Sequence, residues 1–224
     1  KMTVTLGYWK IRGLAANLRY QLAYSDIKYE MVEYEQGDAP DFNSDCWFGV
    51  KRTLGFEFPN LPYLIDGDLK LTETLAIHEY LADKYKPELL GSTPEVRAHV
   101  SMTSAILSSL KNAVTGPCYG GDDRTVITKA VNKNLPKIVE YLGKKTFLVG
   151  DEVTYIDFYF FELLHLILLL HPTVFEEHPS LKTYSDTMSN LSGLKEYLSD
   201  ASSIDNNRPF NNKCAHQNGS AKFC

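Results

Sequence analysis

The sequence predicts an α+β fold in which a small domain with a mixed sheet precedes an all-helical domain. Over residues 1–86, strand-like and helical patterns alternate, whereas residues 92–224 show long helical patterns without a clear strand signal. Pro87 ends the last helical pattern of the first part, and Ser92 opens the next one. We therefore expect one domain at residues 1–86 and a second at residues 92–224.

The first part shows the order strand, helix and strand, followed by two strands and a helix. A β-branched run, an alternating run and the Asp66-Gly67 hairpin signal predict the strands, and apolar residues at helical spacing predict the helices. This order is typical of a thioredoxin-like domain. The expected elements are strands at 3–6, 28–32, 61–65 and 70–72, and helices at 13–24 and about 73–85.

The second part is expected to begin with Ser92 as a helix cap, because Pro94 suits a first turn and Glu95 completes a capping box. Glycine and proline predict interruptions at 116–121 and 143–151. The polar, asparagine-rich tail from Ser202 is expected to run over the surface.

The most apolar stretch, residues 155–170, is predicted to be a buried helix and not a membrane span. It is shorter than the roughly 20 residues that a span needs, and it contains Asp157, Glu162 and His165. Thr154 and Asp157 resemble a capping box at its start. A helix that is apolar on nearly every side suits the centre of an all-helical domain.

Composition and cysteine spacing exclude several classes of function. A net charge of −5 gives no reason to expect nucleic-acid binding. The cysteines (Cys46, Cys118, Cys214 and Cys224) show neither CxxC nor metal-ligand spacing, and the first residues do not resemble a secretory leader. We therefore expect free thiols, no metal site, no membrane association and a cytosolic location.

Tyr8 stands where the first strand ends and a helical pattern follows, a place that often presents a side chain to a ligand. A free thiol titrates near pH ~8.5, so only a small fraction is thiolate at neutral pH. A phenolic O–H donated to the sulfur would favour the charged form and lower that pKa. In isolation, a buried core tyrosine is the commoner role.

Two further segments suit an extended peptide ligand. If the Leu61-Pro62 bond is cis, Leu61 can expose its N–H and C=O for pairing with a ligand backbone. Taken alone, an ordinary edge-strand proline is the simpler reading, but beside the other motifs we expect the cis bond. The helix that starts at Glu73-Thr74 offers free N–H groups to a carboxylate, and Thr74 is also a plausible simple cap.

Segments 6–14, 58–67, 72–77 and 153–158 resemble the mu class of the cytosolic glutathione transferases, and the resemblance covers nearly the whole chain. It implies an enzyme that joins the thiol of glutathione, its co-substrate, to small hydrophobic electrophiles without a cofactor. It also implies that Tyr8 activates the thiol and that Phe58 inserts into the partner subunit of a homodimer. The implied glutathione site is Trp9, Trp47, Lys51, Asn60, Leu61, Pro62, Glu73 and Thr74, and the implied electrophile pocket is Ile11, Leu14 and Tyr119.

The chain departs from the class pattern at three places. Ser44 stands where the class usually has an arginine, Glu73-Thr74 where it has Gln-Ser, and Leu107 where it has an aspartate that reaches across the dimer. Lys51 remains as a cation, and its neighbour Arg52 is a candidate to compensate for Ser44. Glu73 is a candidate source of the negative charge that Leu107 lacks.

Some alternatives stay open at this point. A binding or structural homologue that has kept the fold and relaxed the chemistry would also fit the three departures. A disulfide oxidoreductase does not fit, because no cysteine follows the first strand. Asn211 and Asn212 either polarise the electrophile pocket or lie on the surface, and Cys118 is either a reactive thiol or, more simply, a buried inert one.

Overall fold

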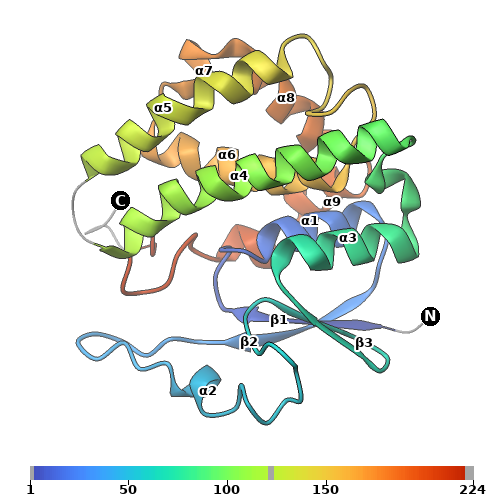
Figure 1. Ribbon diagram of the computed structural model, residues 1–224. Helices are drawn as coiled ribbons and strands as arrows, with labels where there is room; N and C mark the ends of the chain where they lie inside the picture. The colour runs from blue at the N-terminus through green and yellow to red at the C-terminus, as the bar shows by residue number, and fades with distance from the viewer. Residues whose placement is uncertain (1–2, 121–123, 220–224) are drawn as a thin grey trace.

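The computed structural model describes residues 3–120 and 124–219 and shows a sheet domain beneath a layer of helices (Figure 1). The sheet has strand order β2-β1-β3-β4. β1 pairs in parallel with β2 and antiparallel with β3, and β4 completes a hairpin with β3. The strands are β1 Val4–Trp9, β2 Tyr29–Tyr34, β3 Tyr63–Asp66 and β4 Leu69–Thr72, and the helices of this part are α1 Ala16–Tyr24, α2 Asp45–Phe48 and α3 Thr74–Tyr85. This confirms the predicted element order and the thioredoxin-like fold.

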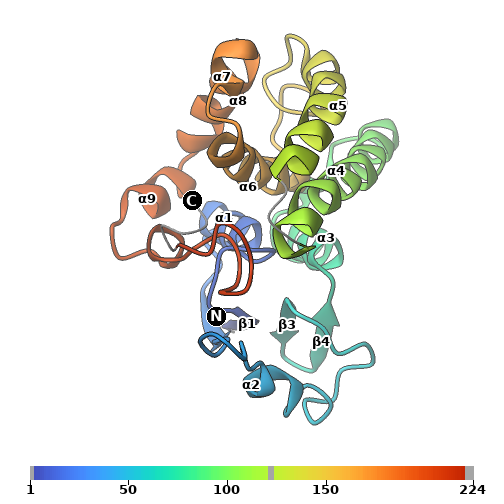
Figure 2. The ribbon, with the colours of Figure 1, turned by 90° about the vertical axis from the view of Figure 1, so that its left-hand side faces the viewer.

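Helices α1 and α3 cover one face of the sheet, and α2 lies on its other side (Figures 1 and 2). The side chains of α1 are buried in two directions. Leu18 and Leu22 belong to the sheet-side core, whereas Ala16 and Tyr20 belong to the core of the helical layer. α1 therefore packs the two parts of the molecule together, and α3 does so as well through Ala82 and His78.

The helical layer begins after the short 3-10 helix η1 (Pro87–Leu90), and its elements surround α6. α6 is apolar and almost wholly buried, as predicted from its sequence. The elements of the helical layer are α4 Pro94–Gly120, α5 Arg124–Leu142, α6 Tyr155–Leu170, α7 Val174–Glu177, α8 Pro179–Ser189, α9 Leu194–Ser199 and the 3-10 helix η2 Ile204–Asn207. No helix within the described ranges is both long and apolar enough to cross a membrane.

The predicted capping box at the start of α6 is confirmed. The Asp157 carboxylate accepts hydrogen bonds from the N–H and the hydroxyl of Thr154, at 2.8 and 2.9 Å. It also accepts the Leu148 N–H at 2.9 Å and the Tyr184 hydroxyl at 3.1 Å. Burial raises the pKa of Asp157, and these donors oppose that shift. The carboxylate thus joins the preceding loop and α8 to the central helix.

Two sequence predictions about helix ends are wrong. α4 is capped by Thr93 and not by Ser92, because the Thr93 hydroxyl accepts the Val96 N–H at 3.3 Å. The expected break at Gly116-Pro117 does not occur, since α4 continues through Pro117 to Gly120. A proline in the last turn removes one backbone hydrogen bond without displacing the many core contacts made earlier along the helix. Gly121 and Cys224 lie outside the described residues.

The tail does not run over the surface as expected. Phe210, Asn211 and Ala215 are buried, and Figure 2 shows the red C-terminal segment lying between the helical layer and the sheet. Its backbone joins the loop after β1: the Arg12 N–H donates to Pro209 O at 2.8 Å, and the Gly13 N–H donates to Phe210 O at 2.9 Å. Local polarity predicted exposure, but Phe210 joins the apolar core of the helical layer in the folded chain.

Candidate active site

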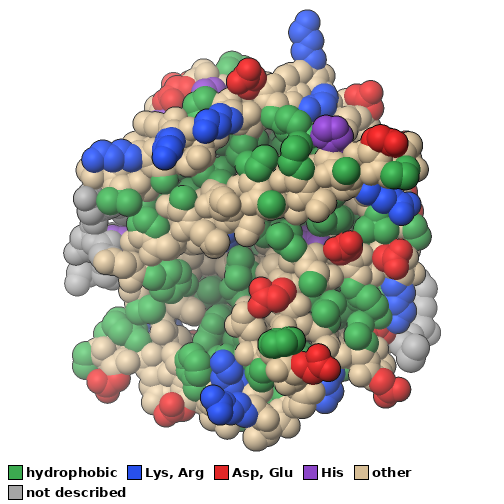
Figure 3. Space-filling view, in the orientation of Figure 1, with side chains coloured by type: hydrophobic (Ala, Val, Ile, Leu, Met, Phe, Trp, Pro, Cys, Tyr) green, Lys and Arg blue, Asp and Glu red, His purple; other side chains and the backbone are tan. Residues whose placement is uncertain are grey.

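A cleft of about 370 Å³ opens between the sheet domain and the C-terminal end of α4. In Figure 3 the surface is hollowed on the left, below α4 and above the segment that carries α2. Segments from four separate parts of the sequence form the walls. The lining residues are Tyr8, Trp9, Gly13, Leu14, Trp47, Phe48, Lys51, Asn60, Leu61, Lys111, Asn112, Thr115, Tyr119, Asn211 and Asn212.

Tyr8 is the penultimate residue of β1, is 5 % exposed and lines the cleft. Its side chain ends in a phenolic hydroxyl. That oxygen accepts the Leu14 N–H at 2.9 Å. Burial raises the pKa of Tyr8 above its ordinary value near 10.0, so the phenol keeps its proton across the neutral range. Because the N–H of Leu14 occupies the acceptor side of the oxygen, the O–H proton is left to donate to a ligand.

The loop between β1 and α1 holds this geometry. The Arg12 guanidinium donates to both carboxylate oxygens of Glu162 on α6, at 3.0 and 2.6 Å. Tyr20 donates its hydroxyl to the same carboxylate at 2.9 Å. Arg19 donates to Ile11 O at 3.1 Å. The loop is therefore fixed from α1, from α6 and from the tail.

Gly13 fits this loop because it takes φ +46° beside the phenol. A Cβ atom at this position would lie 2.5 Å from the Tyr8 hydroxyl oxygen. Both the positive φ and the close approach favour glycine over other residues.

The sheet-domain wall of the cleft contains most of the predicted glutathione-site residues. Trp47 is buried, and the Lys51 ammonium lies 5.7 Å from its ring centroid. Leu61 has no hydrogen-bond partner for its backbone N–H or C=O among the described residues, and the Leu61-Pro62 bond is cis, as predicted. Of the two cations considered, Lys51 lines the cleft, and Arg52 is not among the lining residues.

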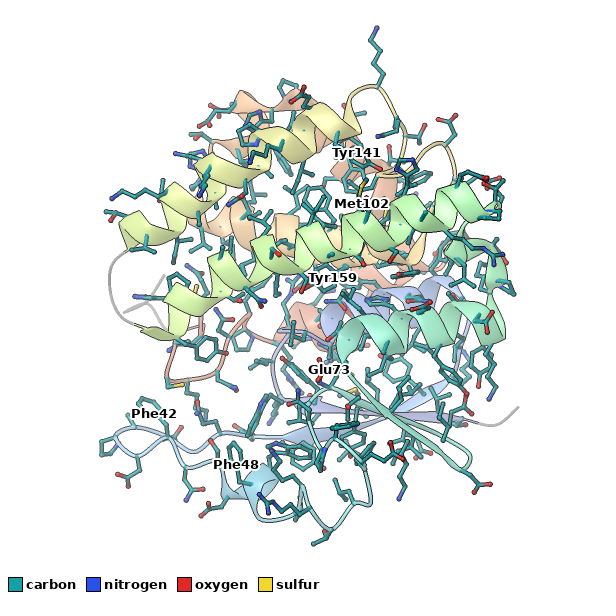
Figure 4. All side chains as sticks on the ribbon, in the orientation of Figure 1. Phe42, Phe48, Glu73, Met102, Tyr141 and Tyr159 are labelled. Atoms are coloured by element: carbon teal, nitrogen blue, oxygen red, sulfur yellow. The ribbon has the colours of Figure 1, made fainter. Side chains whose placement is uncertain are left out.

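Glu73 lies just before α3 and holds φ +72°, an uncommon conformation for a residue other than glycine. Its exposed carboxylate accepts the Asn60 side-chain N–H at 2.9 Å. Figure 4 places Glu73 and the α2 residue Phe48 on the sheet side of the molecule, below α4. Thr74 is buried, and its hydroxyl faces Leu14 O at 3.5 Å.

The opposite wall is more polar than the sequence analysis suggested. Leu14 and Tyr119 line the cleft, whereas Ile11 is buried outside its lining. Asn211 and Asn212 both line the cleft. The Tyr119 hydroxyl accepts the Asn212 N–H at 3.1 Å. Cys118 is buried with its thiol facing Val114 O at 3.4 Å, as expected of an inert cysteine.

Lys111, Asn112 and Thr115 also line the cleft and were not predicted from the sequence. A signal existed, because Lys111, Thr115 and Tyr119 follow one another at four-residue intervals and therefore share one face of a helix. The expected helix break at Gly116-Pro117 hid this relationship by separating Tyr119 from the other two.

Two of the three departures from the class pattern have a clear structural position. The Ser44 hydroxyl donates to Phe42 O at 3.2 Å just before α2. Leu107 is fully buried and lies in a groove between α4 and α5, away from the cleft. In the described ranges, no group of three or more His, Cys, Asp and Glu side chains is arranged to hold a metal ion.

Comparison with known proteins decides the family. Residues 4–83 match the glutathione S-transferase N-terminal domain, and residues 118–201 match the glutathione S-transferase C-terminal domain. Glutathione S-transferase Mu 4 of Rattus norvegicus is 38% identical over 201 residues, which cover 88% of this chain and 91% of the relative. Glutathione S-transferase Mu 1 of Bos taurus is 36% identical over the same 88% of this chain and 91% of its own length. The chain belongs to the mu class of the glutathione S-transferases.

Solved structures of this glutathione transferase family agree with the fold. The pi-class glutathione S-transferase of Onchocerca volvulus has a TM-score of 0.78 at 25% identity and covers 96% of this chain and 100% of its own. The glutathione S-transferase Blo t 8 has a TM-score of 0.77 at 27% identity, covering 94% and 98%. The protein is thus an enzyme that uses glutathione as a substrate.

Replacing Gly13 by alanine should displace the Tyr8 hydroxyl. We expect kcat/KM for 1-chloro-2,4-dinitrobenzene with glutathione to fall by roughly 100-fold, the cost of moving a reacting group by about 1 Å. Gly67→Ala is the matched control, because Gly67 has φ +62° but no atom within 4 Å of the added Cβ. Similar losses of activity in both variants would show that backbone strain, and not the contact with Tyr8, is responsible.

Proposed function

We propose that Tyr8 donates a hydrogen bond from its phenolic O–H to the sulfur of glutathione and stabilises the thiolate, which then attacks a small hydrophobic electrophile. The observation that carries this proposal is the 2.9 Å hydrogen bond from the Leu14 N–H to the Tyr8 oxygen. It orients the phenol and leaves its O–H as a donor. The raised pKa of Tyr8 supports the same role, because a phenolate would repel a thiolate.

In this mechanism the thiol proton leaves to solvent and the phenol keeps its own proton. The sulfur electron pair then forms a bond to carbon. In substitution the leaving group departs with its bonding pair; in addition the π bond breaks, its electron pair moves to the neighbouring atom, and water supplies the proton. Holding the two substrates together in one cleft supplies the orientation. The electrophile would lie against Leu14 and Tyr119, with Ile11 supporting this wall from the core.

The tripeptide would lie along the sheet-domain wall. The available N–H and C=O of Leu61, beside Pro62, suit the cysteinyl backbone, and Lys51 with Trp47 and Asn60 suits the glycyl end. The start of α3 at Thr74 suits the γ-glutamyl carboxylate, since the first N–H groups of a helix have no partner within the helix. Trp9 lines the same wall.

Replacing Tyr8 by phenylalanine should move the pH dependence of the reaction. We expect the apparent pKa in kcat/KM to rise toward that of the free thiol, near ~8.5, and kcat/KM at pH ~6.5 to fall about 10- to 100-fold, the value of one hydrogen bond to a charged group. Steady-state kinetics between pH ~5.5 and ~9 measure both. Tyr80→Phe, on the side of α3 that bonds Asp66, is the control. An unmoved pH profile in Tyr8→Phe would contradict the proposal.

We further propose that the Glu73 carboxylate binds the α-amino group of glutathione. It would then take the role of the aspartate that the class usually has where this chain has Leu107. Its strained backbone and its exposed position beside Asn60 support this role. Glu73→Gln should raise the dissociation constant for glutathione about 10-fold or more, because a charge-assisted hydrogen bond is lost. Calorimetric titration measures this, with Glu79→Gln on the same helix as control. Unchanged affinity in Glu73→Gln would show that the hypothesis is wrong.

We also propose a homodimer in which the partner subunit's Phe58 fills the groove between α4 and α5. Phe58 is 77 % exposed, which is unusual for a side chain of this size. The groove has a volume of about 660 Å³ and is largely apolar. Figure 4 labels Met102 on α4 and Tyr141 on α5, which lie on its two sides. A two-fold axis would form the contact twice, each subunit giving one phenylalanine and one groove.

Replacing Phe58 by serine should weaken the dimer. We expect the dissociation constant to rise about 30-fold or more, because a buried aromatic anchor contributes at least about 2 kcal/mol. Sedimentation velocity over a range of concentrations measures it. Leu169→Ser is the matched control, since Leu169 is a 52 % exposed apolar residue on α6. A variant that stays dimeric to the same dilution as the native protein would contradict the proposed contact.

A further inference from the structure

Lys111 is a buried cation in the wall of the cleft. It lies on α4, is 5 % exposed, and lines the same cavity as Tyr8 and Tyr119. Its ammonium donates to Gly13 O at 3.3 Å. Gly13 is also the residue that lies against the Tyr8 hydroxyl. The Lys111 ammonium and the Tyr8 phenol therefore both lie against Gly13.

The protein satisfies this cation only in part. An ammonium has three N–H donors, and one carbonyl uses one of them. Within the described ranges, no carboxylate forms an ion pair with Lys111. The Glu162 carboxylate attracts it, but the oxygens of Glu162 already accept hydrogen bonds from Arg12 and Tyr20. A buried charge with unused donors costs free energy unless a ligand completes its shell.

Burial lowers the pKa of Lys111 from its ordinary value of 10.5. This does not remove its capacity to donate, since both an ammonium and a neutral amine carry N–H bonds.

The surrounding wall is polar on the same side. Asn112 and Thr115 on α4 and Asn211 and Asn212 of the tail line the cavity with Lys111. The apolar contact surface for the electrophile, Leu14, lies on the loop that carries Gly13. The cavity thus suits a ligand with an apolar body and a polar oxygen, the latter directed to Lys111.

We propose that Lys111 is a specificity-determining residue that donates a hydrogen bond to the carbonyl oxygen of an α,β-unsaturated carbonyl electrophile. This rests on the proposed role of Tyr8, because the carbonyl must lie beside the activated thiolate. The enzyme then favours conjugate addition to enals and enones over substitution at electrophiles that lack a carbonyl oxygen.

The addition step balances without any further reactant. The thiolate sulfur forms a bond to the β-carbon, the C=C electron pair moves to form the new Cα=C bond, and the carbonyl π pair moves onto oxygen. The enolate oxygen carries the negative charge and accepts the Lys111 N–H, a hydrogen bond that strengthens as the charge develops. Water then protonates the α-carbon and the carbonyl is restored. The net change is addition of the glutathione S–H across the double bond.

The competing explanation is purely structural: Lys111 only holds the Gly13 carbonyl. Loss of the side chain would then disturb the loop between β1 and α1 and slow the conjugation of every electrophile to the same extent. A comparison of two electrophiles therefore separates the explanations, one with a conjugated carbonyl (trans-2-nonenal) and one without any oxygen (1-iodohexane).

The experiment measures kcat/KM for both probes in the native enzyme, Lys111→Met, Lys111→Gln and the control Lys133→Met, whose lysine is exposed on α5. We expect the ratio of kcat/KM for trans-2-nonenal to that for 1-iodohexane to fall about 10- to 100-fold in Lys111→Met. Lys111→Gln keeps an N–H donor and should therefore have a ratio between those of Lys111→Met and the native enzyme. Lys133→Met should keep the native ratio.

An unchanged ratio in Lys111→Met, with both rates equally reduced or both intact, would overturn the proposal. Failure of the thiolate mechanism has a different signature. In that case Tyr8→Phe would conjugate 1-iodohexane as fast as the native enzyme, and the role of Lys111 would fall with it.

Discussion

The active site of this glutathione transferase depends on the ion pair between Arg12 and Glu162. The guanidinium binds both carboxylate oxygens, at 3.0 and 2.6 Å, and the Tyr20 hydroxyl donates to the same carboxylate at 2.9 Å. Glu162 is fully buried on the central helix α6. Breaking such a pair from one side leaves an uncompensated charge and costs about 3–5 kcal/mol. The pair therefore fixes the loop after β1 onto the helical layer.

That constraint determines the chemistry of the cleft. With Arg12 fixed, the next residues can present the Leu14 N–H to Tyr8 and the Gly13 carbonyl to Lys111. The tail is fixed to the same loop by two backbone hydrogen bonds, and a second buried pair, Arg19 with Asp205, ties its start to α1. The walls of the cleft come from separate segments, but each is bonded to this one loop. The role proposed for Tyr8, a phenol that keeps its proton beside a thiolate, needs such a rigid frame.

Much of the fold could be predicted from the sequence, because it is encoded locally. Alternation, the Asp66-Gly67 turn and the apolar run of α6 depend on near neighbours, and all three predictions are confirmed. The cis bond at Pro62 is likewise confirmed. The resemblance to the mu class added the placement of Tyr8 and Asn60 in one cleft, which spacing alone does not give.

The remaining features depend on tertiary contacts that no local pattern records. The polar tail packs inward because Phe210 and Asn212 find partners more than ninety residues away in sequence, Arg12 for the first and Tyr119 for the second. Pro117 is tolerated in α4 because the helix is held by its core contacts. Lys111 was missed for a related reason: a lysine at helical spacing is normally a solvated residue, and only the fold reveals that this one faces a cavity.

Activation of the thiol by Tyr8 is tested most directly by an ultraviolet difference titration of the protein with glutathione near neutral pH, with Tyr8→Phe measured in parallel. We expect a saturable thiolate absorption band for the native enzyme that is lost or much reduced in Tyr8→Phe, while glutathione still binds both. A band of equal intensity in the two proteins, or saturable binding to the native enzyme without any band, would contradict the claim that the oriented phenol activates the thiol.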